Sequence, residues 1–325
     1  MDEARRRTEP VHCVFTFDGP FAKYAAVAIA SLLCHAKGPY RITCLVHEAE
    51  PAARGLVEGV AETFGAAVAF IEVDHERFRT WKLFGDVSAA TYYRLAAPRL
   101  LTDARAIYLD SDVLVTCDLG PLFETDLGGA WIGGVVDRAG TKTSRLPLRP
   151  GDPYLNAGVL LLDLEALRLA DFETRCAEVQ RSHADVIQWA DQCVINKAAE
   201  GHKAVLDPRW NVQANDHGCF GLEGKIGAFD RRGILHPNAP FKPWMTWSDP
   251  WLQRLWAGYA RLVELPRSAL VIEPSTLPQW SLRADVLEAE GRWREAAQIR
   301  KKVIAGLTTR TDPATATARS RLRSG

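Results

Sequence analysis

Short apolar runs and longer amphipathic stretches alternate through the first quarter of the chain. The apolar runs over 11–17, 41–48 and 66–74 predict buried strands, and the Ala- and Leu-rich stretches over 24–35 and 51–64 predict helices between them. Strands that alternate with helices form parallel sheets through right-handed crossovers. The pattern therefore predicts an α/β fold with a doubly wound, mostly parallel sheet and helices on both faces.

Two carboxylates interrupt the apolar run over 106–115. Asp110 and Asp112 flank Ser111 at the point where a buried strand ends. Residues two apart lie on the same side of an extended chain, so the two carboxylates are expected to face one point. Two such anions repel unless a cation lies between them, and oxygen ligands suit magnesium, manganese or calcium. The alternative is a strand that turns at an acidic pair without a metal.

The apolar stretch 88–101 predicts a helix that stops near Pro98. One of its cations, Arg94, lies among apolar neighbours. A buried arginine usually pairs with a carboxylate. Two interpretations stay open: an ion pair within the helix layer, or a guanidinium that reaches an anionic or nucleotide group.

Two further polar residues lie beside predicted strands. Asp18 follows the first strand and precedes Gly19 and Pro20, so it belongs to a loop at the sheet edge where open α/β sheets bind ligands. Asn156 precedes a second apolar run, either as a turn-forming residue or as an amide that points into the same cleft. Both residues are candidates for the ligand-binding edge.

The region that follows combines a polar segment with a helical one. Residues 138–153 are basic and lack a hydrophobic period, so we expect a long loop that acts as a lid or a binding segment. Residues 171–200 are mostly helical in pattern and contain Asp191 and Gln192 among apolar neighbours. Polar residues on such a helix are expected first of all at its surface.

The segment 233–244 combines a histidine and a lysine with prolines and aromatic residues. His236 ends a short apolar run, and Lys242 lies in a rigid, extended stretch. A lone histidine is more often structural than a ligand. A lysine fixed beside aromatic residues is harder to explain without a partner, because an ammonium normally prefers open solvent.

The chain changes character towards its C-terminus. Prolines interrupt it beyond residue 262, and two amphipathic helices are predicted to meet near Gly291. The last residues are basic and aperiodic, which is typical of disorder. We expect a disordered N-terminus over 1–10, a main domain over 11–261, and a helical hairpin with a basic tail over 262–325.

Composition narrows the class of protein. Apolar residues make up 47% and charged residues 25% of the chain, as in ordinary globular proteins. Lys plus Arg equals Asp plus Glu at 40 each, so no bulk charge indicates nucleic-acid binding. The seven cysteines form no C-x-x-C pair, and no apolar run reaches the roughly 18 residues of a membrane span. These features favour a cytoplasmic protein with reduced thiols.

Four segments resemble glycosyltransferase family 8, the retaining, metal-dependent transferases of sugar nucleotides, in their order and spacing. They are FTFDGPFAKYAAVAIASL, TYYRLAAPRLLTDARAIYLDSDVLV, YLNAGVLLLDLEALR with WADQCVIN, and HPNAPFKPW. The family includes bacterial lipopolysaccharide galactosyl- and glucosyltransferases and glycogenin-like proteins. The resemblance implies a GT-A type fold for the domain over 11–261.

The resemblance also implies a metal and diphosphate site. Asp110, Asp112 and His236 would bind a divalent ion, Mn²⁺ or Mg²⁺, which also grips the diphosphate of a UDP-sugar. One imidazole with two carboxylates suits manganese better than calcium. Lys242 would contact the diphosphate, where a positive charge stabilises the departing UDP.

The remaining candidates would bind the donor, which the resemblance implies to be UDP-galactose or UDP-glucose. Asp18 would recognise the uracil, and Arg94 would reach the nucleotide-sugar. Asn156, Asp191 and Gln192 would line the sugar pocket. Gln192 stands where a nucleophile is expected, and an amide is a weak nucleophile. A same-face reaction, in which UDP helps to deprotonate the incoming hydroxyl, therefore fits better than a covalent intermediate.

The implied function is transfer of a hexose to a glycan or lipopolysaccharide-type glycolipid. Gly19, Pro20 and Ala239 depart from the residues usual in the family, which motivates an alternative: a UDP-sugar-binding protein without transfer activity. A further alternative is an adaptor that uses its C-terminal helices. The basic tail favours peripheral contact with the cytoplasmic face of the membrane.

Overall fold

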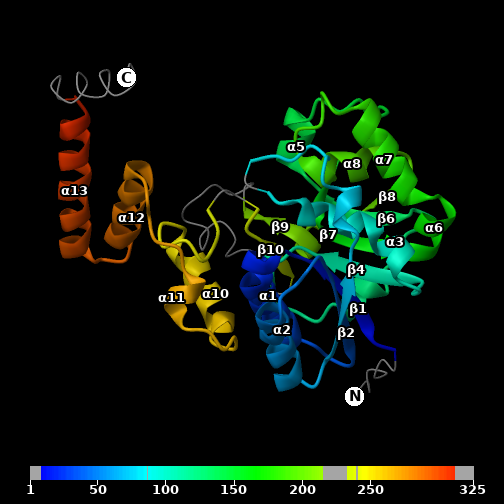
Figure 1. The fold of residues 1–325 in the computed structure, drawn as a ribbon, viewed down its shortest axis with the longest axis horizontal. Coiled ribbons are helices and arrows are strands. Elements are labelled where there is room, and N and C mark those ends of the chain that lie inside the picture. Colours follow the sequence, from blue (N-terminus) through cyan, green and yellow to red (C-terminus); the bar gives the residue numbers. More distant parts are fainter. Residues whose placement is uncertain (1–8, 86, 215–232, 239–240, 312–325) are drawn as a thin grey trace.

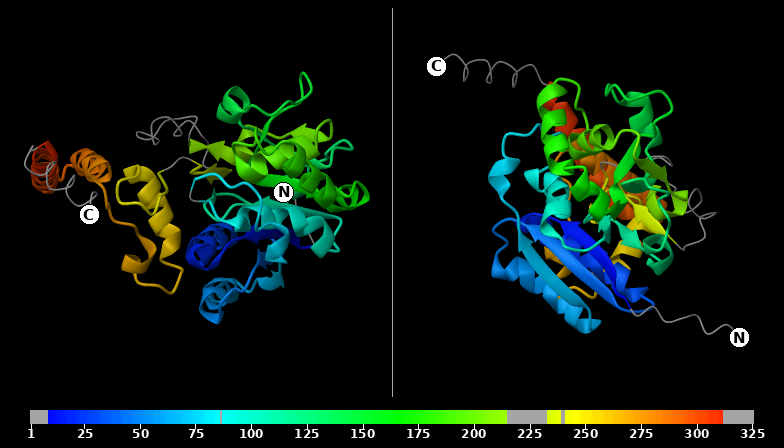
Figure 2. Two further views of the ribbon diagram at one scale, coloured as in Figure 1. Left: turned by 45° about the horizontal axis from the view of Figure 1, so that its top comes forward. Right: turned by 90° about the vertical axis from the view of Figure 1, so that its right-hand side faces the viewer.

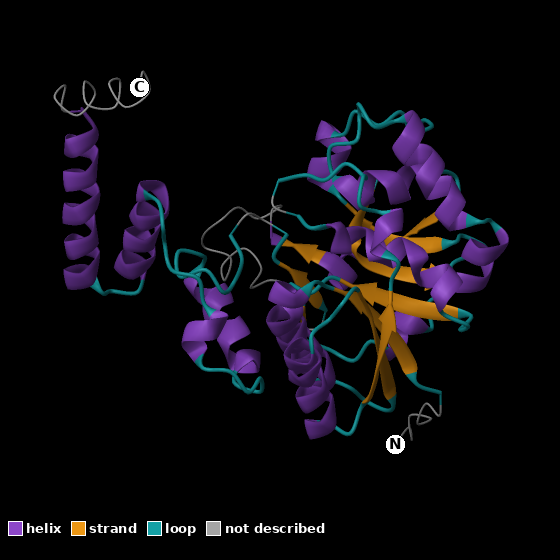
Figure 3. Cartoon of the chain, in the orientation of Figure 1, coloured by secondary structure: helices purple, strands orange, loops and turns teal. Residues whose placement is uncertain are grey.

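We describe the protein from a computed structural model, which covers residues 9–85, 87–214, 233–238 and 241–311. A seven-stranded sheet with strand order β3-β2-β1-β4-β7-β6-β8 forms its centre. Its strands are β1 (Val11–Thr16), β2 (Tyr40–Val46), β3 (Ala67–Glu72), β4 (Arg105–Leu109), β6 (Ile132–Val136), β7 (Leu155–Asp163) and β8 (Lys203–Val205). Figure 3 shows these strands as a layer with helices on either side.

The sheet is mostly parallel, as the pattern predicted. Only β7 runs antiparallel to its neighbours β4 and β6, and the remaining pairs are parallel. The C-terminal ends of β1, β4 and β6 therefore share one edge of the sheet with the N-terminal end of β7. Ligands bind at this kind of edge in open α/β sheets.

Helices cover both faces of the sheet, which confirms the doubly wound prediction. On one face α1 (Ala22–Cys34) and α2 (Pro51–Thr63) pack in one core cluster with Phe15. On the other face, Val14 packs in a second core cluster with α6 (Leu164–Leu169), α7 (Phe172–Ser182) and α8 (Ala190–Ala198). Neighbouring strand residues point to opposite faces, so β1 contributes to both clusters. The described cysteines are all free thiols.

The run over 106–115 forms two strands, which the acidic pair separates. β4 ends at Leu109, the chain turns through the acidic pair, and β5 (Leu114–Val115) belongs to a second sheet. There β5 pairs antiparallel with β10 (Ile234–His236), which also pairs with β9 (Val212–Gln213). The turn allows the carboxylates to leave the hydrogen-bonded ladder, and the second sheet brings a distant segment beside them.

Two local predictions were wrong. The stretch 88–101 forms a 3-10 helix over Ala89–Ala96, continued by α3 (Ala97–Leu100), and Pro98 lies in the first turn of α3. A proline is tolerated there because a first-turn N–H has no partner within the helix. The expected long loop contains α5 (Arg138–Thr143), whose N-cap is Asp137. The side chain of Asp137 caps the N-terminus of α5, and this hydrogen bond stabilises a helix at the beginning of the polar stretch.

The C-terminal part begins with helices that pack on the main body. α10 (Pro250–Ala260) and α11 (Arg267–Leu270) contribute Trp256 and Leu270 to the core cluster that contains α1. Tyr24 of α1 stacks on Trp244, with ring centroids 3.8 Å apart. The core cluster that contains α1 therefore includes residues beyond 261.

The predicted helical hairpin is present. α12 (Leu277–Ala289) and α13 (Trp293–Thr311) meet at Gly291, which adopts a positive φ of 74°. The hairpin has its own small cluster of Ala284, Leu287 and Ala296, and it stands apart from the sheet in Figures 1 and 2. We propose that the boundary of the main domain lies just before α12. The expectations for residues 1–8, Ala239 and the basic tail fall outside the described residues.

Within the described ranges, no helix has the length and apolar character that crossing a membrane requires.

Candidate active site

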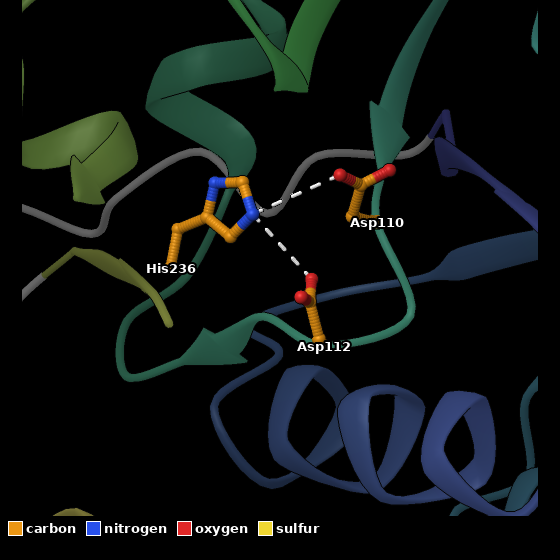
Figure 4. Close-up of side chains that lie close together, drawn as sticks. All are labelled: Asp110, Asp112 and His236. Atoms are coloured by element: carbon orange, nitrogen blue, oxygen red, sulfur yellow. Dashed lines mark ion pairs between the residues drawn. The ribbon is translucent and has the colours of Figure 1, made fainter. Parts of the chain in front are cut away.

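Three side chains from two sheets converge at the carboxyl edge. Asp110 and Asp112 lie in the turn between β4 and β5, and His236 is the last residue of β10. One ligand atom from each lies within 4.8 Å of the other two. Figure 4 shows both carboxylates pointing towards the imidazole. The pairing of β5 with β10 therefore explains how residues 124 positions apart meet.

The imidazole is oriented by a buried amide. Nδ1 of His236 lies 3.0 Å from Oδ1 of Asn211, and an amide oxygen only accepts hydrogen bonds. Nδ1 therefore carries the proton and donates it to Asn211. This leaves the lone pair of Nε2 directed at the two carboxylates. Histidine ligands of metals are oriented in the same way, because the other ring nitrogen donates to a carbonyl or carboxylate.

Each carboxylate is anchored through one oxygen and offers the other. Oδ2 of Asp112 accepts a 2.5 Å bond from Nζ of Lys242, and Oδ1 of Asp110 accepts 2.8 Å bonds from Tyr108 and Arg94. The remaining oxygens lie 3.4 Å (Asp112) and 3.7 Å (Asp110) from Nε2 of His236. Three acceptor atoms thus face one another.

The facing acceptors explain an unsatisfied atom. Oδ1 of Asp112 is buried and has no hydrogen-bond partner, and an unpartnered buried acceptor is costly. Burial by itself raises the pKa of Asp112, but Lys242 and His236 outweigh it and hold that pKa well below its usual range. The group therefore remains an anion. A divalent cation would satisfy both carboxylates and the imidazole, and ligation at about 2.1 Å suits ligand atoms only a few ångströms apart.

Glycine is required beside the imidazole. A Cβ added at Gly158 of β7 would lie 2.1 Å from Cε1 of His236 and 2.8 Å from Oδ2 of Asp110. The backbone of Gly158 also accepts a 2.8 Å bond from the N–H of Asp110. Close approach of β7 therefore fixes the acidic turn.

A buried arginine joins two acids behind the cluster. Arg94 lies 2.8 Å from Asp110 and 3.2 Å from Asp191, and it donates to the carbonyl oxygen of Ala157 at 2.7 Å. Burial lowers the pKa of Arg94, but Asp110 and Asp191 raise it above its normal value. Its guanidinium also lies 4.1 Å from the centroid of the Tyr108 ring. Of the two interpretations of Arg94, the ion pair is therefore present.

Asp191 is not at the surface, contrary to the first expectation. It lies in the first turn of α8, is 7% exposed, and faces Arg94. Its Oδ1 accepts a 2.5 Å bond from Thr91. Burial raises the pKa of Asp191, and Arg94 opposes that rise only in part. The sequence prediction of a surface position was wrong because Arg94, a buried ionic partner, compensates the charge of Asp191. Periodicity does not show such a partner.

Asn156 and Gln192 meet at Asp137. The side-chain NH₂ groups of Asn156 and Gln192 donate to Oδ2 of Asp137 at 3.3 Å and 3.0 Å. Oδ1 of Asn156 accepts a 2.8 Å bond from Asn211, the residue that orients His236. A chain of hydrogen bonds therefore connects Asp137 to the metal-type cluster.

Asp18 lies at the same edge but outside this network. It is half-buried at the end of β1, and its carboxylate accepts a 3.2 Å bond from the N–H of Phe21. Burial, Asp18 and Glu72 raise the pKa of Tyr93 to about 12, which indicates that Asp18 lies near Tyr93. Among the described residues Asp18 makes no hydrogen bond or ion pair with the acidic turn, and it is available to contact another part of a ligand.

Sequence reasoning missed three residues that support the site. Asp137 ends the short apolar run over 131–137, and a polar residue at the end of such a run could have identified it. Gly158 interrupts an apolar strand, which often marks a close approach. Asn211 carried no signal, because its role depends on the placement of His236.

Comparisons with known proteins agree with this geometry. The family described as Glycosyl transferase family 8 matches residues 12–248. The glycosyltransferase GlyF of Streptococcus pneumoniae serotype 4 is 28% identical over 206 residues, which cover 62% of this chain and 49% of that protein. The lipopolysaccharide 1,2-glucosyltransferase of Escherichia coli K12 is 28% identical over 172 residues, covering 50% of this chain and 51% of that protein. The matches thus span about half the length of these two relatives.

A solved structure matches over a larger share. It is the galactosyltransferase LgtC in complex with donor and acceptor sugar analogs, with a TM-score of 0.72 and 27% identity. The match covers 80% of this chain and all of that chain. The sheet, the acidic turn and these comparisons lead to one conclusion. The chain belongs to glycosyl transferase family 8 and has its GT-A type fold.

Proposed function

We propose that the protein transfers galactose or glucose from a UDP-sugar to a hydroxyl of a glycan or glycolipid, with retention at the anomeric carbon. One observation carries this proposal: the free oxygens of Asp110 and Asp112 and the lone pair of His236 converge on one point, and Oδ1 of Asp112 has no other partner. A site that presents three acceptors and no donor at its centre is suited to a cation.

The three converging residues would hold Mn²⁺ or Mg²⁺. The ion would supply positive charge for the diphosphate of the leaving UDP. Lys242 is suited to the same task, because its Nζ is held by Asp112 and by the carbonyl oxygen of Pro237 at 2.8 Å. An ammonium in that position stabilises negative charge that develops as the sugar–phosphate bond breaks.

We assign Arg94 a positioning role in addition to its proposed contact with the donor. It pairs with Asp110 and Asp191 at the same time, and in our proposal Asp191 faces the donor sugar. Asp18, at the end of β1, would recognise the uracil. The half-buried loop that carries it leaves room beside Gly19, where an added Cβ would meet no atom within 4 Å.

Retention would proceed on one face of the sugar. The amide of Gln192 accepts from the N–H of Ala157 at 3.1 Å and donates to Asp137, so it is suited to positioning rather than to attack. Asp191 is paired with Arg94, and Asn156 is anchored on both sides. These groups would hold sugar hydroxyls, while an oxygen of the departing UDP accepts the proton of the attacking hydroxyl.

The acceptor and the cellular location are part of the proposal. One relative is named as a lipopolysaccharide glucosyltransferase, which supports a surface glycan or glycolipid acceptor. Such an acceptor lies at the membrane. We propose that the protein works in the cytoplasm and contacts the membrane peripherally, through the hairpin and tail. On α13, Trp293 is 66% exposed and Ile304 60% exposed, and Lys301 and Lys302 lie between them in the sequence.

The test is release of UDP from UDP-galactose and UDP-glucose in the presence of Mn²⁺. We expect turnover with one of the donors, and a loss of at least a thousandfold in the double variant Asp110→Ala, Asp112→Ala. The double variant Glu58→Ala, Glu62→Ala removes two exposed carboxylates from α2 and serves as the matched control. Tight UDP binding without release or transfer would instead support the non-catalytic alternative.

A further inference from the structure

A run of cations follows the strand that ends beside the site. Residues 138–151 contain Arg138, Lys142, Arg145 and Arg149 and no acidic residue. Arg149 lies 3.7 Å from Glu200. The other three are exposed, and across the described ranges no carboxylate lies within ion-pairing distance of them. Three positive charges are therefore available to a ligand.

Two of these cations line a hollow. Arg138 and Lys142 lie four residues apart on α5, and with Ala139 and Thr143 they border an open depression of about 440 Å³. Like charges at this spacing destabilise a helix, and an anion bound between them would remove that repulsion.

The nearest acid does not neutralise them. The carboxylate of Asp137 points into the site, where Oδ1 accepts from the N–H of Gly140 at 2.6 Å and Oδ2 accepts from Asn156 and Gln192. Its hydrogen-bonding capacity is thus used by amide donors. Arg138, the next residue, remains exposed to solvent.

α5 is held rigidly at the active edge. A Cβ added at Gly140 would lie 2.6 Å from a ring carbon of Tyr154, so the helix packs directly on that ring. Its N-cap, Asp137, follows β6 at the same sheet edge as the acidic turn and is connected through Asn156 and Asn211 to His236. The cations therefore have a fixed position beside Asp137, which also accepts a hydrogen bond from Gln192.

We propose that Arg138 and Lys142 bind a negatively charged group, a phosphate or a carboxylate, on the acceptor sugar. The inference rests on the proposed transferase function and adds the class of acceptor. The donor's own phosphates belong to Lys242 and the metal-type cluster, so an anion at α5 belongs to the second substrate. The two cations select acceptors by charge and orient them towards Gln192.

The experiment separates binding from turnover. Glucose, glucose 6-phosphate and glucuronate are titrated by NMR onto the protein with UDP and Mn²⁺ present, at constant ionic strength. The variants are the double variant Arg138→Gln, Lys142→Gln and the control double variant Arg261→Gln, Arg267→Gln, which removes the same charge from exposed positions at the C-cap of α10 and the start of α11. Release of UDP without acceptor is measured for each protein and tests the transferase function separately.

We expect at least one of the two anionic sugars to bind at least tenfold more tightly than glucose. The double variant on α5 should reduce that preference to less than twofold, whereas the control variant should keep it. Release of UDP without acceptor should be the same in all three proteins. Tighter binding of glucose 6-phosphate than of glucuronate, or the reverse, identifies the anionic group that the site prefers. Equal binding of all three sugars, or a preference that survives in the α5 variant, would overturn the proposal even if UDP release is normal.

Discussion

Asn211 and His236 form a buried pair in which the amide oxygen of Asn211 lies 3.0 Å from Nδ1 of the imidazole. Both residues are almost fully buried. The pair fixes the tautomer that leaves Nε2 free, and it joins the cluster to Asn156 and Asp137. The second sheet, formed by β5, β9 and β10, holds this pair beside the acidic turn.

Replacing Asn211 tests this orientation. Asn211→Leu removes the acceptor for Nδ1–H, and partners of this kind contribute about 10- to 100-fold to metal affinity. We therefore expect Mn²⁺ to bind at least tenfold more weakly, as measured by calorimetry. Asn211→Asp keeps an acceptor at the same position and should retain most of the affinity. Equal losses in both variants would contradict the claim that the acceptor oxygen of Asn211 orients His236.

Gly158→Ala tests the close approach of β7. The added methyl group would overlap the imidazole of His236 and crowd Asp110, so the ligands must move apart. We expect loss of Mn²⁺-dependent activity by more than tenfold with the fold retained by circular dichroism. Gly59→Ala on α2, where a Cβ meets nothing within 4 Å, is the control and should stabilise the helix by about 0.5–1 kcal/mol. Normal activity in Gly158→Ala would contradict the geometry.

Arg94→Met tests the buried ion pairs. It leaves Asp110 and Asp191 without their shared cation, and removal of one partner of a buried pair costs about 3–5 kcal/mol. We expect a drop of that order in the free energy of unfolding in urea. Adding Asp191→Asn should recover part of the loss, because one uncompensated charge disappears. Strict additivity of the two changes would show that the residues are not coupled.

His12 is buried at the edge of the sheet opposite the acidic turn, and its burial predicts that acid lowers the stability of the fold. Burial first, and then the charge of Arg41, lower the pKa of His12 from 6.5 to about 4, while Asp103 opposes the shift. The folded state thus favours neutral His12, and its contribution is complete above pH 6.5 and is lost as the pH falls towards 4. Between pH 7.5 and 5 the loss is about 2 kcal/mol by linkage. Urea unfolding of His12→Gln should show a pH dependence smaller by that amount, and an unchanged dependence would contradict the assignment.

The sequence pattern was sufficient for the sheet and its helices, because apolar periodicity determines which residues are buried. It placed Asp110 and Asp112 at a strand end, but it did not predict that the chain turns there into a second sheet, which brings the acidic pair beside His236. Asp191 was expected at the surface for a related reason: its burial depends on Arg94, a partner 97 positions away.

Other parts of the site depend on contacts that no local pattern encodes. The pairing of β10 with β5 brings His236 to the turn, and only the resemblance to a family had suggested that meeting. α5 was read as a loop because its stability comes from Asp137 and from the packing of Gly140 on Tyr154. Such tertiary contacts override a weak helical propensity.

The most direct test of the central claim is a count of bound Mn²⁺ by electron paramagnetic resonance, with and without UDP. The account predicts one ion per chain in the wild-type protein, tighter binding when UDP is present, and no specific ion in the variant Asp110→Ala, Asp112→Ala. Undiminished Mn²⁺ binding in that variant would contradict the claim that the acidic turn and His236 hold the metal.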